Sequence, residues 1–114
     1  MTIHEGTELE KLGRLSRPAV LVLVSLAAGP KHGYGIMQDV RSLDGTQLEP
    51  GTLYAVLARL ESRGWIEALP VDGRRRPYAL TVLGNAVLRR YLTGLKHVAD
   101  TGLRRLQPLQ RALR

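Results

Sequence analysis

The chain has 114 residues, no cysteine and a formal net charge of +7, which suits one compact domain and excludes disulfides and thiolate metal or redox sites. Its 44% hydrophobic and 24% charged residues are ordinary values for a globular protein and exclude a wholly disordered chain. Residues 74–114 carry 10 basic and 1 acidic side chains, which favours a polyanion partner, nucleic acid ahead of membrane, over an arginine-rich solvated surface.

The first predicted helix covers Leu9 to Ala28, divided near Pro18, a residue tolerated at a first helical position. Gly29-Pro30 ends it. Its apolar stretch, residues 19–28, is too short to span a membrane and, with acidic residues before it, makes a poor signal peptide. We therefore expect a cytoplasmic protein that does not contact a membrane.

A second, short helix is predicted over His32 to Val40, followed by a turn at Asp44-Gly45. The buried face of this helix is expected to consist of Ile36, Val40 and Leu43. We expect Tyr34 to pack against the core at the start of the helix. This interpretation of His32 and Tyr34 is preferred to a ligand-binding one.

The third helix is predicted from Pro50 to about Arg63, with Glu49 as a weak N-cap and Gly64 as the left-handed residue beyond its end. Its buried face is Leu53, Val56, Leu57 and Leu60. The opposite side carries a strip of small residues, namely Gly51, Ala55, Ala58 and Ser62. Such a strip lets a helix lie deep in the major groove of DNA, although an ordinary exposed helix surface remains the alternative.

Three residues of the same helix have side chains that suit contacts with DNA beside the strip. Arg59 is the best candidate for a base contact, because a guanidinium group can reach O6 and N7 of guanine together. Thr52 and Tyr54 are better suited to phosphate. Within the strip, the methyl group of Ala55 can meet a thymine methyl.

Two β-like runs follow, residues 65–71 and 77–81, with Asp72-Gly73 between them as a hairpin turn. Trp65 is expected in the core at the base of this hairpin. Arg74, Arg75 and Arg76 come directly after the turn, where three consecutive guanidinium groups suit phosphate or minor-groove contact. A solvated loop is the default for such a triplet alone, and its place after the third helix favours DNA.

Thr81 is predicted to cap a long final helix that extends to about Gln107, because Pro108 would break or kink it. An unbroken heptad of apolar and small residues runs along this helix: Leu88, Leu92, Leu95, Ala99, Gly102, Leu106, Leu109 and Leu113. This spacing is typical of a helix that packs lengthwise on another helix. We expect dimerisation through this seam, with packing on the chain's own first helix as the alternative.

The order helix, helix, helix, hairpin, long helix predicts a mainly α fold with a minor β part, and it is the layout of a winged helix-turn-helix. Residues 1–81 are expected to form the N-terminal helix and the DNA-binding domain, and residues 82–114 the C-terminal dimerisation helix and tail. The function predicted is sequence-specific binding of double-stranded DNA by a homodimer, on a roughly palindromic operator.

Four motifs also resemble the PadR-like transcriptional regulators: GPKHGYGI at residues 29–36, PGTLY at 50–54, LARLESRGWI at 57–66 and RRRPYALT at 74–81. The resemblance covers roughly residues 15–90. It implies a winged-helix DNA-binding domain, homodimerisation through the C-terminal helix and repression of a nearby promoter. Members of the family often respond to small-molecule effectors, phenolic compounds or cationic drugs, bound near the dimer interface.

This chain departs from the family pattern at several positions. Glu49 stands where Ser is common, and Ala55 stands where Pro is frequent. Pro77-Tyr78 replaces an aromatic pair, and Tyr91 is the only aromatic residue of the long helix. The absence of tryptophan there argues against a flat drug held between helix tryptophans.

Other classes of protein explain less of the sequence. The histidines His4, His32 and His97 are scattered and no paired carboxylates or phosphate loop occur, so we expect no enzyme, no metal and no cofactor. An RNA-binding or ribosome-associated basic protein would explain the charge, but the aromatic residues that stack on RNA bases make up only 4% of the chain. A dimeric adaptor that does not bind DNA would explain the heptad and not the three arginines.

Overall fold

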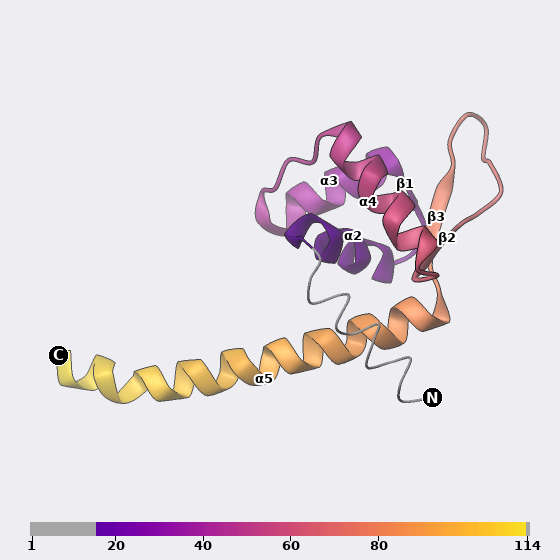
Figure 1. Ribbon diagram of the computed structural model, residues 1–114. Coiled ribbons are helices and arrows are strands. Elements are labelled where there is room, and N and C mark those ends of the chain that lie inside the picture. Colours follow the sequence, from indigo (N-terminus) through magenta and orange to yellow (C-terminus); the bar gives the residue numbers. More distant parts are fainter. Residues whose placement is uncertain (1–15, 114) are drawn as a thin grey trace.

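The computed structural model describes residues 16–113, with side chains up to Pro108, and it shows a winged helix-turn-helix with a long C-terminal helix (Figure 1). The elements are α2 (Arg17–Ala27), β1 (Lys31–His32), α3 (Gly33–Asp44), α4 (Pro50–Ser62), β2 (Ile66–Ala68), β3 (Pro77–Leu80) and α5 (Val82–Leu113). The predicted fold class is confirmed. The predicted helix before Ser16 lies outside the described residues.

Helix α2 occupies the centre of the helical cluster, and most of its side chains are buried. Pro18 lies in its first turn, where the fixed φ of proline favours helix and no backbone donor is lost. At its other end, Lys31 Nζ donates to the carbonyl of Ser25 at 2.5 Å. A cation bonded to one of the last carbonyls of α2 stabilises that end of the helix.

Helix α3 differs from its prediction at both ends. It begins at Gly33 and continues past Val40 to Asp44, where Gly45 ends it with a φ of +81°. Ile36 and Val40 are fully buried, but Leu43 is 47% exposed, so the prediction that it is buried is wrong. Leu48, from the loop that follows α3, is 8% exposed and belongs to the core.

The prediction that Tyr34 packs against the core is also wrong, because its side chain is 59% exposed. The reason is helical geometry. Tyr34 precedes Ile36 by two residues, which places it about 200° around the helix from the buried face. Tyr34 is therefore available to a partner outside the chain.

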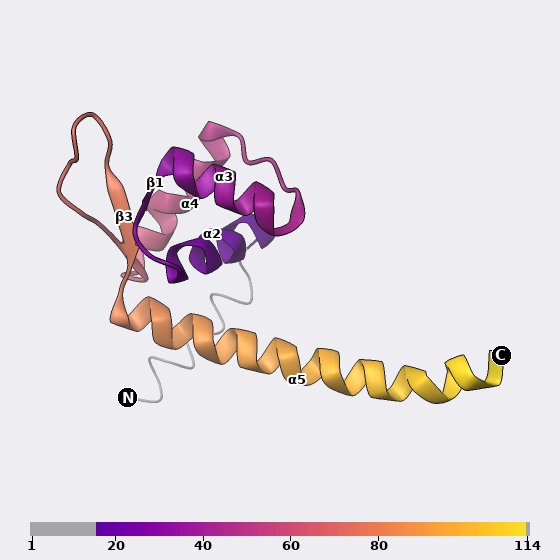
Figure 2. The same cartoon turned by 180° about the vertical axis from the view of Figure 1, so that it is seen from behind.

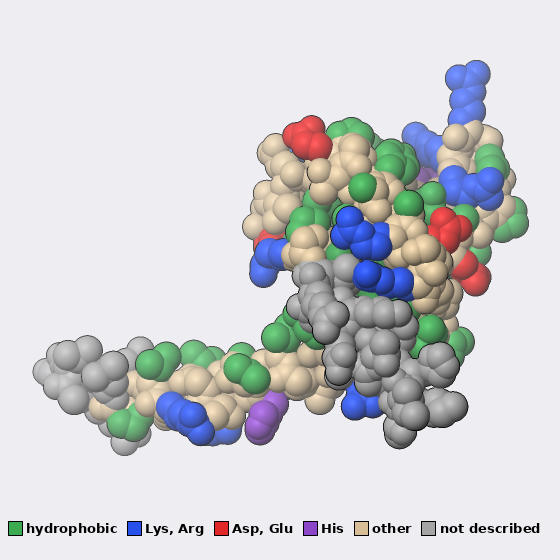
Figure 3. Space-filling model, viewed as in Figure 1, with side chains coloured by type: hydrophobic (Ala, Val, Ile, Leu, Met, Phe, Trp, Pro, Cys, Tyr) green, Lys and Arg blue, Asp and Glu red, His purple; other side chains and the backbone are tan. Residues whose placement is uncertain are grey.

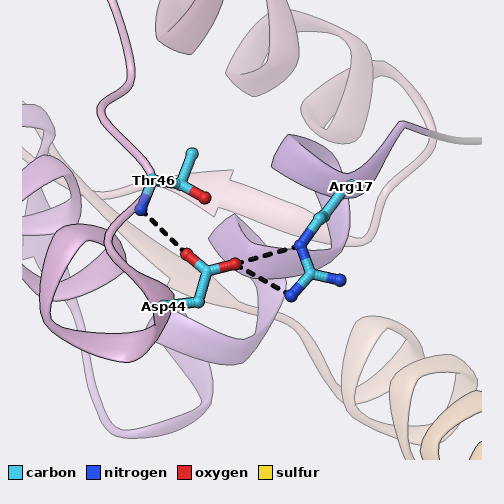
Figure 4. Close-up of polar contacts among 3 residues, drawn as sticks. All are labelled: Arg17, Asp44 and Thr46. Carbon is cyan, nitrogen blue, oxygen red and sulfur yellow. Dashed lines mark hydrogen bonds and ion pairs between the residues drawn. The ribbon is translucent and has the colours of Figure 1, made fainter.

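An ion pair joins the first turn of α2 to the turn after α3 (Figure 4). Arg17 donates from Nε to Asp44 Oδ2 at 3.0 Å, and the backbone N–H of Thr46 donates to Asp44 Oδ1 at 3.0 Å. Hydrogen bonds from Thr46, and then from Arg17, hold the pKa of the Asp44 carboxyl below its usual value of 3.8. The charged form of Asp44 is therefore the one that the fold stabilises.

Asp44→Asn should lower the melting temperature slightly near neutral pH and make no difference in strong acid. Because the folded-state pKa of Asp44 is depressed, its contribution is present above the unfolded value of 3.8 and is lost as pH falls through the lower folded value. Thermal unfolding from about pH 7 down to about pH 2 measures this, with the exposed Glu61→Gln as control. The prediction would be contradicted if the difference in melting temperature between Asp44→Asn and the wild-type protein were the same at both ends of this pH range.

The wing is part of a three-stranded antiparallel sheet in the order β1-β3-β2. Strand β1 was not predicted, since its two residues carry no periodic pattern; Lys31 pairs with Tyr78 and His32 with Pro77. Strand β2 is shorter than the predicted run because Pro70 lacks a backbone donor. Trp65, at the base of the wing, is fully buried as predicted.

The turn at the tip of the wing is displaced by one residue from its predicted position. Asp72 and Arg75 exchange two backbone hydrogen bonds, of 2.8 and 3.1 Å, so Gly73-Arg74 are the central residues. Gly73 has a φ of +65°, which a glycine at the first central position adopts without strain. Arg74 therefore lies at the tip itself.

Helix α5 begins with the predicted cap, because Thr81 Oγ1 accepts from the N–H of Gly84 at 3.0 Å. It continues through Pro108 to Leu113, so the predicted end near Gln107 is wrong. The helix passes beneath the helical cluster, on the side opposite the tip of the wing (Figure 1 and Figure 2). In residues 16–113 we find no helix long and apolar enough to cross a membrane.

Candidate nucleic-acid interface

Helix α4 is divided lengthwise into a buried and an exposed side, as its sequence predicts. Leu53, Val56, Leu57 and Leu60 are buried in the core. Every candidate contact residue on the other side is exposed: Gly51, Thr52, Tyr54, Ala55, Ala58, Arg59 and Ser62. Pro50 opens the helix, and Glu49 precedes it without a side-chain capping bond. The structure therefore presents a small-sided helix, with one guanidinium near its end, to the solvent.

The three arginines of the wing have different surroundings. Arg74 lies at the turn, and basic side chains gather around the tip of the wing in Figure 3. The backbone of Arg75 pairs with Asp72. Arg76 Nη1 donates to the carbonyl of Leu69 at 2.7 Å, across the wing. Arg76 thus holds the two sides of the wing together and has other donors left for a partner.

A cavity of about 430 Å³ opens between the wing and the first turn of α3; we call it the wing cavity. It is lined by His32, Gly33, Tyr34, Tyr54, Arg74, Arg75 and Arg76. Four of the seven predicted contact residues meet here, whereas Thr52, Ala55 and Arg59 lie elsewhere on α4. Sequence reasoning missed the three residues from α3 and the strand before it. The position of Tyr34 opposite Ile36 on the helical wheel is the signal that would have found it.

The predicted dimerisation residues divide into two groups along α5. Leu88 is only 3% exposed and belongs to the core of its own chain, as in the intrachain alternative. Leu92, Leu95 and Leu106 are 39%, 47% and 52% exposed. The exposed side also carries Val98 and Leu103, which the heptad does not contain. Figure 3 shows apolar side chains along one edge of this helix, and the side chains of Leu109 and Leu113 lie outside the described part of the chain.

A second cavity, of about 670 Å³, lies where α2, β3 and the start of α5 meet, and we call it the junction cavity. Its lining is mostly apolar and includes Leu26, Pro30, Leu80 and Ala86, and Arg89 and Arg90 also line it. Among residues 16–113, no group of three or more His, Asp or Glu side chains is placed to hold a metal ion.

Comparison with known proteins gives consistent matches in sequence and in fold. The family model of the PadR-like transcriptional regulators matches residues 22–90. An uncharacterized 37.1 kDa protein in transposon TN4556 of Streptomyces fradiae is 43% identical over 77 residues, which are 68% of this chain and only 22% of that protein. A transcriptional regulator of Mycobacterium tuberculosis is 37% identical over 95 residues, covering 71% of this chain and 88% of the regulator. The crystal structure of a PadR family regulator from Clostridium difficile has a TM-score of 0.70 at 24% identity, covering 80% of this chain and 99% of that one.

Proposed function

Because the chain belongs to the PadR-like family of transcriptional regulators, we propose that it is a homodimeric repressor that binds a pseudo-palindromic operator in double-stranded DNA. The family consists of regulators and not of enzymes, and membership implies DNA binding. One observation carries the proposal: the exposed, small-sided helix α4 lies beside a wing with three arginines. We place the protein in the cytoplasm, where chromosomal DNA is accessible to it.

The exposed side of α4 supports a role as the recognition helix. Small side chains such as Ala55 and Ala58 allow its backbone to approach base edges closely. Arg59 is exposed and is our candidate for reading a guanine. Thr52 and Tyr54, near the start of the helix, are assigned to phosphate. In this arrangement the helix supplies sequence preference and the wing arginines supply affinity.

The exposed apolar side of α5 supports dimerisation by a second copy of the chain. Large apolar side chains that recur along one side of a helix are uncommon on a soluble surface unless a partner covers them. The contact residues we propose are Leu92, Leu95, Ala99, Gly102 and Leu106, whereas Leu88 is buried in the core of its own chain and is left out of this contact. In a dimer with two-fold symmetry, the two α4 helices would reach successive major grooves about 34 Å apart.

We also propose that a small-molecule effector relieves DNA binding. The junction cavity supports this, because it has an apolar lining and lies between the DNA-binding domain and the proposed dimerisation helix. A ligand that binds this cavity more tightly when α5 makes one particular angle with the DNA-binding domain would favour dimers with that angle. If that angle spaces the two α4 helices wrongly for DNA, the repressor leaves its operator.

Binding to duplex DNA should fall steeply with salt, because arginines that neutralise phosphates release counterions. The double variant Arg74→Ala and Arg75→Ala should lower the slope of log affinity against log salt by about 1.8 per protomer, and so by up to about 3.6 for a dimer with both wings on DNA, and weaken binding at least roughly 50-fold near 0.1 M salt. Fluorescence anisotropy on a labelled duplex of mixed sequence, titrated with KCl, measures both values.

The matched control removes the same charge from α5, as Arg104→Ala with Arg105→Ala, and should change the slope little. No salt dependence in the wild-type protein would overturn the DNA-binding proposal. Tighter binding to duplex RNA than to DNA would favour the RNA-binding alternative. A stable dimer that binds neither would favour the adaptor.

A further inference from the structure

The wing cavity is shaped by a close contact between α3 and α4. A Cβ atom at Gly33 would lie 2.8 Å from the hydroxyl oxygen of Tyr54, so only glycine allows this approach. The hydroxyl of Tyr54 therefore rests against the first turn of α3. The arginines of the wing form the opposite wall. The wing cavity is thus lined by residues that are far apart in the sequence.

The chemistry of the lining favours an anion. Arg74, Arg75 and Arg76 contribute three guanidinium groups, and no Asp or Glu is among the lining residues. Tyr34 and Tyr54 add two phenolic hydroxyls, and the two rings are 59% and 54% exposed. Guanidinium and phenol groups bind phosphate oxygens with charge-assisted hydrogen bonds. A cavity of about 430 Å³ that is open to solvent suits a continuous strand.

Tyr34 has a hydroxyl that is oriented for donation outward. Gln38 Nε2, one turn further along α3, donates to Tyr34 Oη at 3.2 Å. Because this oxygen already accepts from Gln38, the proton of the Tyr34 hydroxyl points to another partner. Within the described part of the chain no group accepts this proton, and the Tyr34 side chain lines the wing cavity, which is rich in positive charge.

We infer that the wing cavity holds the sugar-phosphate backbone of one DNA strand, and that Tyr34 donates a hydrogen bond to one of its phosphate oxygens. The inference rests on the proposed function and extends it to α3, a helix to which sequence analysis assigned no DNA contact. Backbone contacts fix the register of a protein on the duplex without reading bases. Tyr34 therefore contributes affinity for every sequence.

Tyr34→Phe tests the inference, because it removes the hydroxyl and keeps the exposed ring. Binding to a duplex of mixed sequence, about 24 base pairs long, should weaken roughly tenfold for each protomer that contacts the duplex, the usual effect of losing one hydrogen bond to a charged group. The salt slope should stay unchanged, since no positive charge is lost. Combined with Arg75→Ala, the loss should be smaller than the product of the two single losses, because both residues face one cavity.

Tyr91→Phe on α5 makes the same chemical change away from the wing and should bind DNA as the wild type does. If Tyr34→Phe binds within about twofold of wild type, the assignment of the wing cavity is overturned while the proposed function stands. If the wild-type protein binds the duplex without salt dependence, the proposed function fails and the inference fails with it.

Discussion

A variant carrying Leu95→Asp and Leu106→Asp is expected to be monomeric and to bind an operator-length duplex at least about a hundredfold more weakly than the wild-type protein. Both leucines are about half exposed in the single chain, so aspartate there should leave the fold of the chain intact. In a helix pair they would lie in the seam, where two buried carboxylates from each protomer, without partners, strongly oppose association. Sedimentation velocity gives the oligomeric state, and fluorescence anisotropy gives the affinity.

The matched control for this variant is Val82→Asp with Thr93→Asp, which adds the same charge to exposed positions of α5 outside the heptad. The control should remain dimeric and lose only the affinity due to its two negative charges. A monomeric wild-type protein, or a seam variant that stays dimeric, would contradict the assignment of α5 as the dimerisation helix.

The features that could be predicted from the sequence are those with a strong period or a turn residue. The buried side of α4 was predicted because leucine and valine recur at helical spacing, and its exposed side follows from the same pattern. Gly64, with a φ of +76°, and the capping hydroxyl of Thr81 were predicted from local chemistry. These elements position most of the candidate site.

The features that could not be predicted depend on contacts between distant segments. Strand β1 exists because β3 pairs with it, and two residues carry no pattern of their own. Leu43 has the spacing of a buried residue, yet the end of α3 reaches beyond the core that would cover it. The wing cavity brings Tyr34 and Tyr54 to the arginines of the wing, an arrangement that no single segment encodes.

A short connection links α4, the recognition helix that we propose, to α5, the proposed dimerisation helix. Helix α4 ends at Ser62, and only Arg63 and Gly64 separate it from Trp65. The carbonyl of Trp65 accepts from the N–H of Thr81 at 3.0 Å, and the hydroxyl of Thr81 donates to the carbonyl of Gly64 at 2.6 Å. The start of α5 is thus bonded to the residues that end α4. A change in the angle between α5 and the helical cluster would therefore act directly on α4.

Gly84→Ala is expected to damage this connection, whereas alanine at Gly94 or Gly102, the other glycines of α5, would meet no atom within 4 Å. A Cβ atom at residue 84 would lie 2.0 Å from the carbonyl oxygen of Trp65 and 2.9 Å from its carbonyl carbon. These are backbone atoms fixed by the bonds around Thr81, so they cannot move aside as a flexible side chain would. We expect a loss of about 3 kcal/mol in the free energy of unfolding, or a fall of roughly 12 °C or more in melting temperature.

Gly94→Ala separates this steric effect from the general effect of replacing glycine in a helix. Position 94 has no atom within 4 Å of an added Cβ, so alanine there should stabilise the helix by up to about 1 kcal/mol. If Gly84→Ala also melts at or above the wild-type temperature, α5 can move away from Trp65 at little cost. The connection would then be a hinge, and an effector in the adjacent junction cavity would need little binding energy to move α5. If the variant is destabilised as expected, the angle between α4 and α5 is held firmly. The proposed effector must then bind the conformation with one angle much more tightly than the conformation with the other to release the operator.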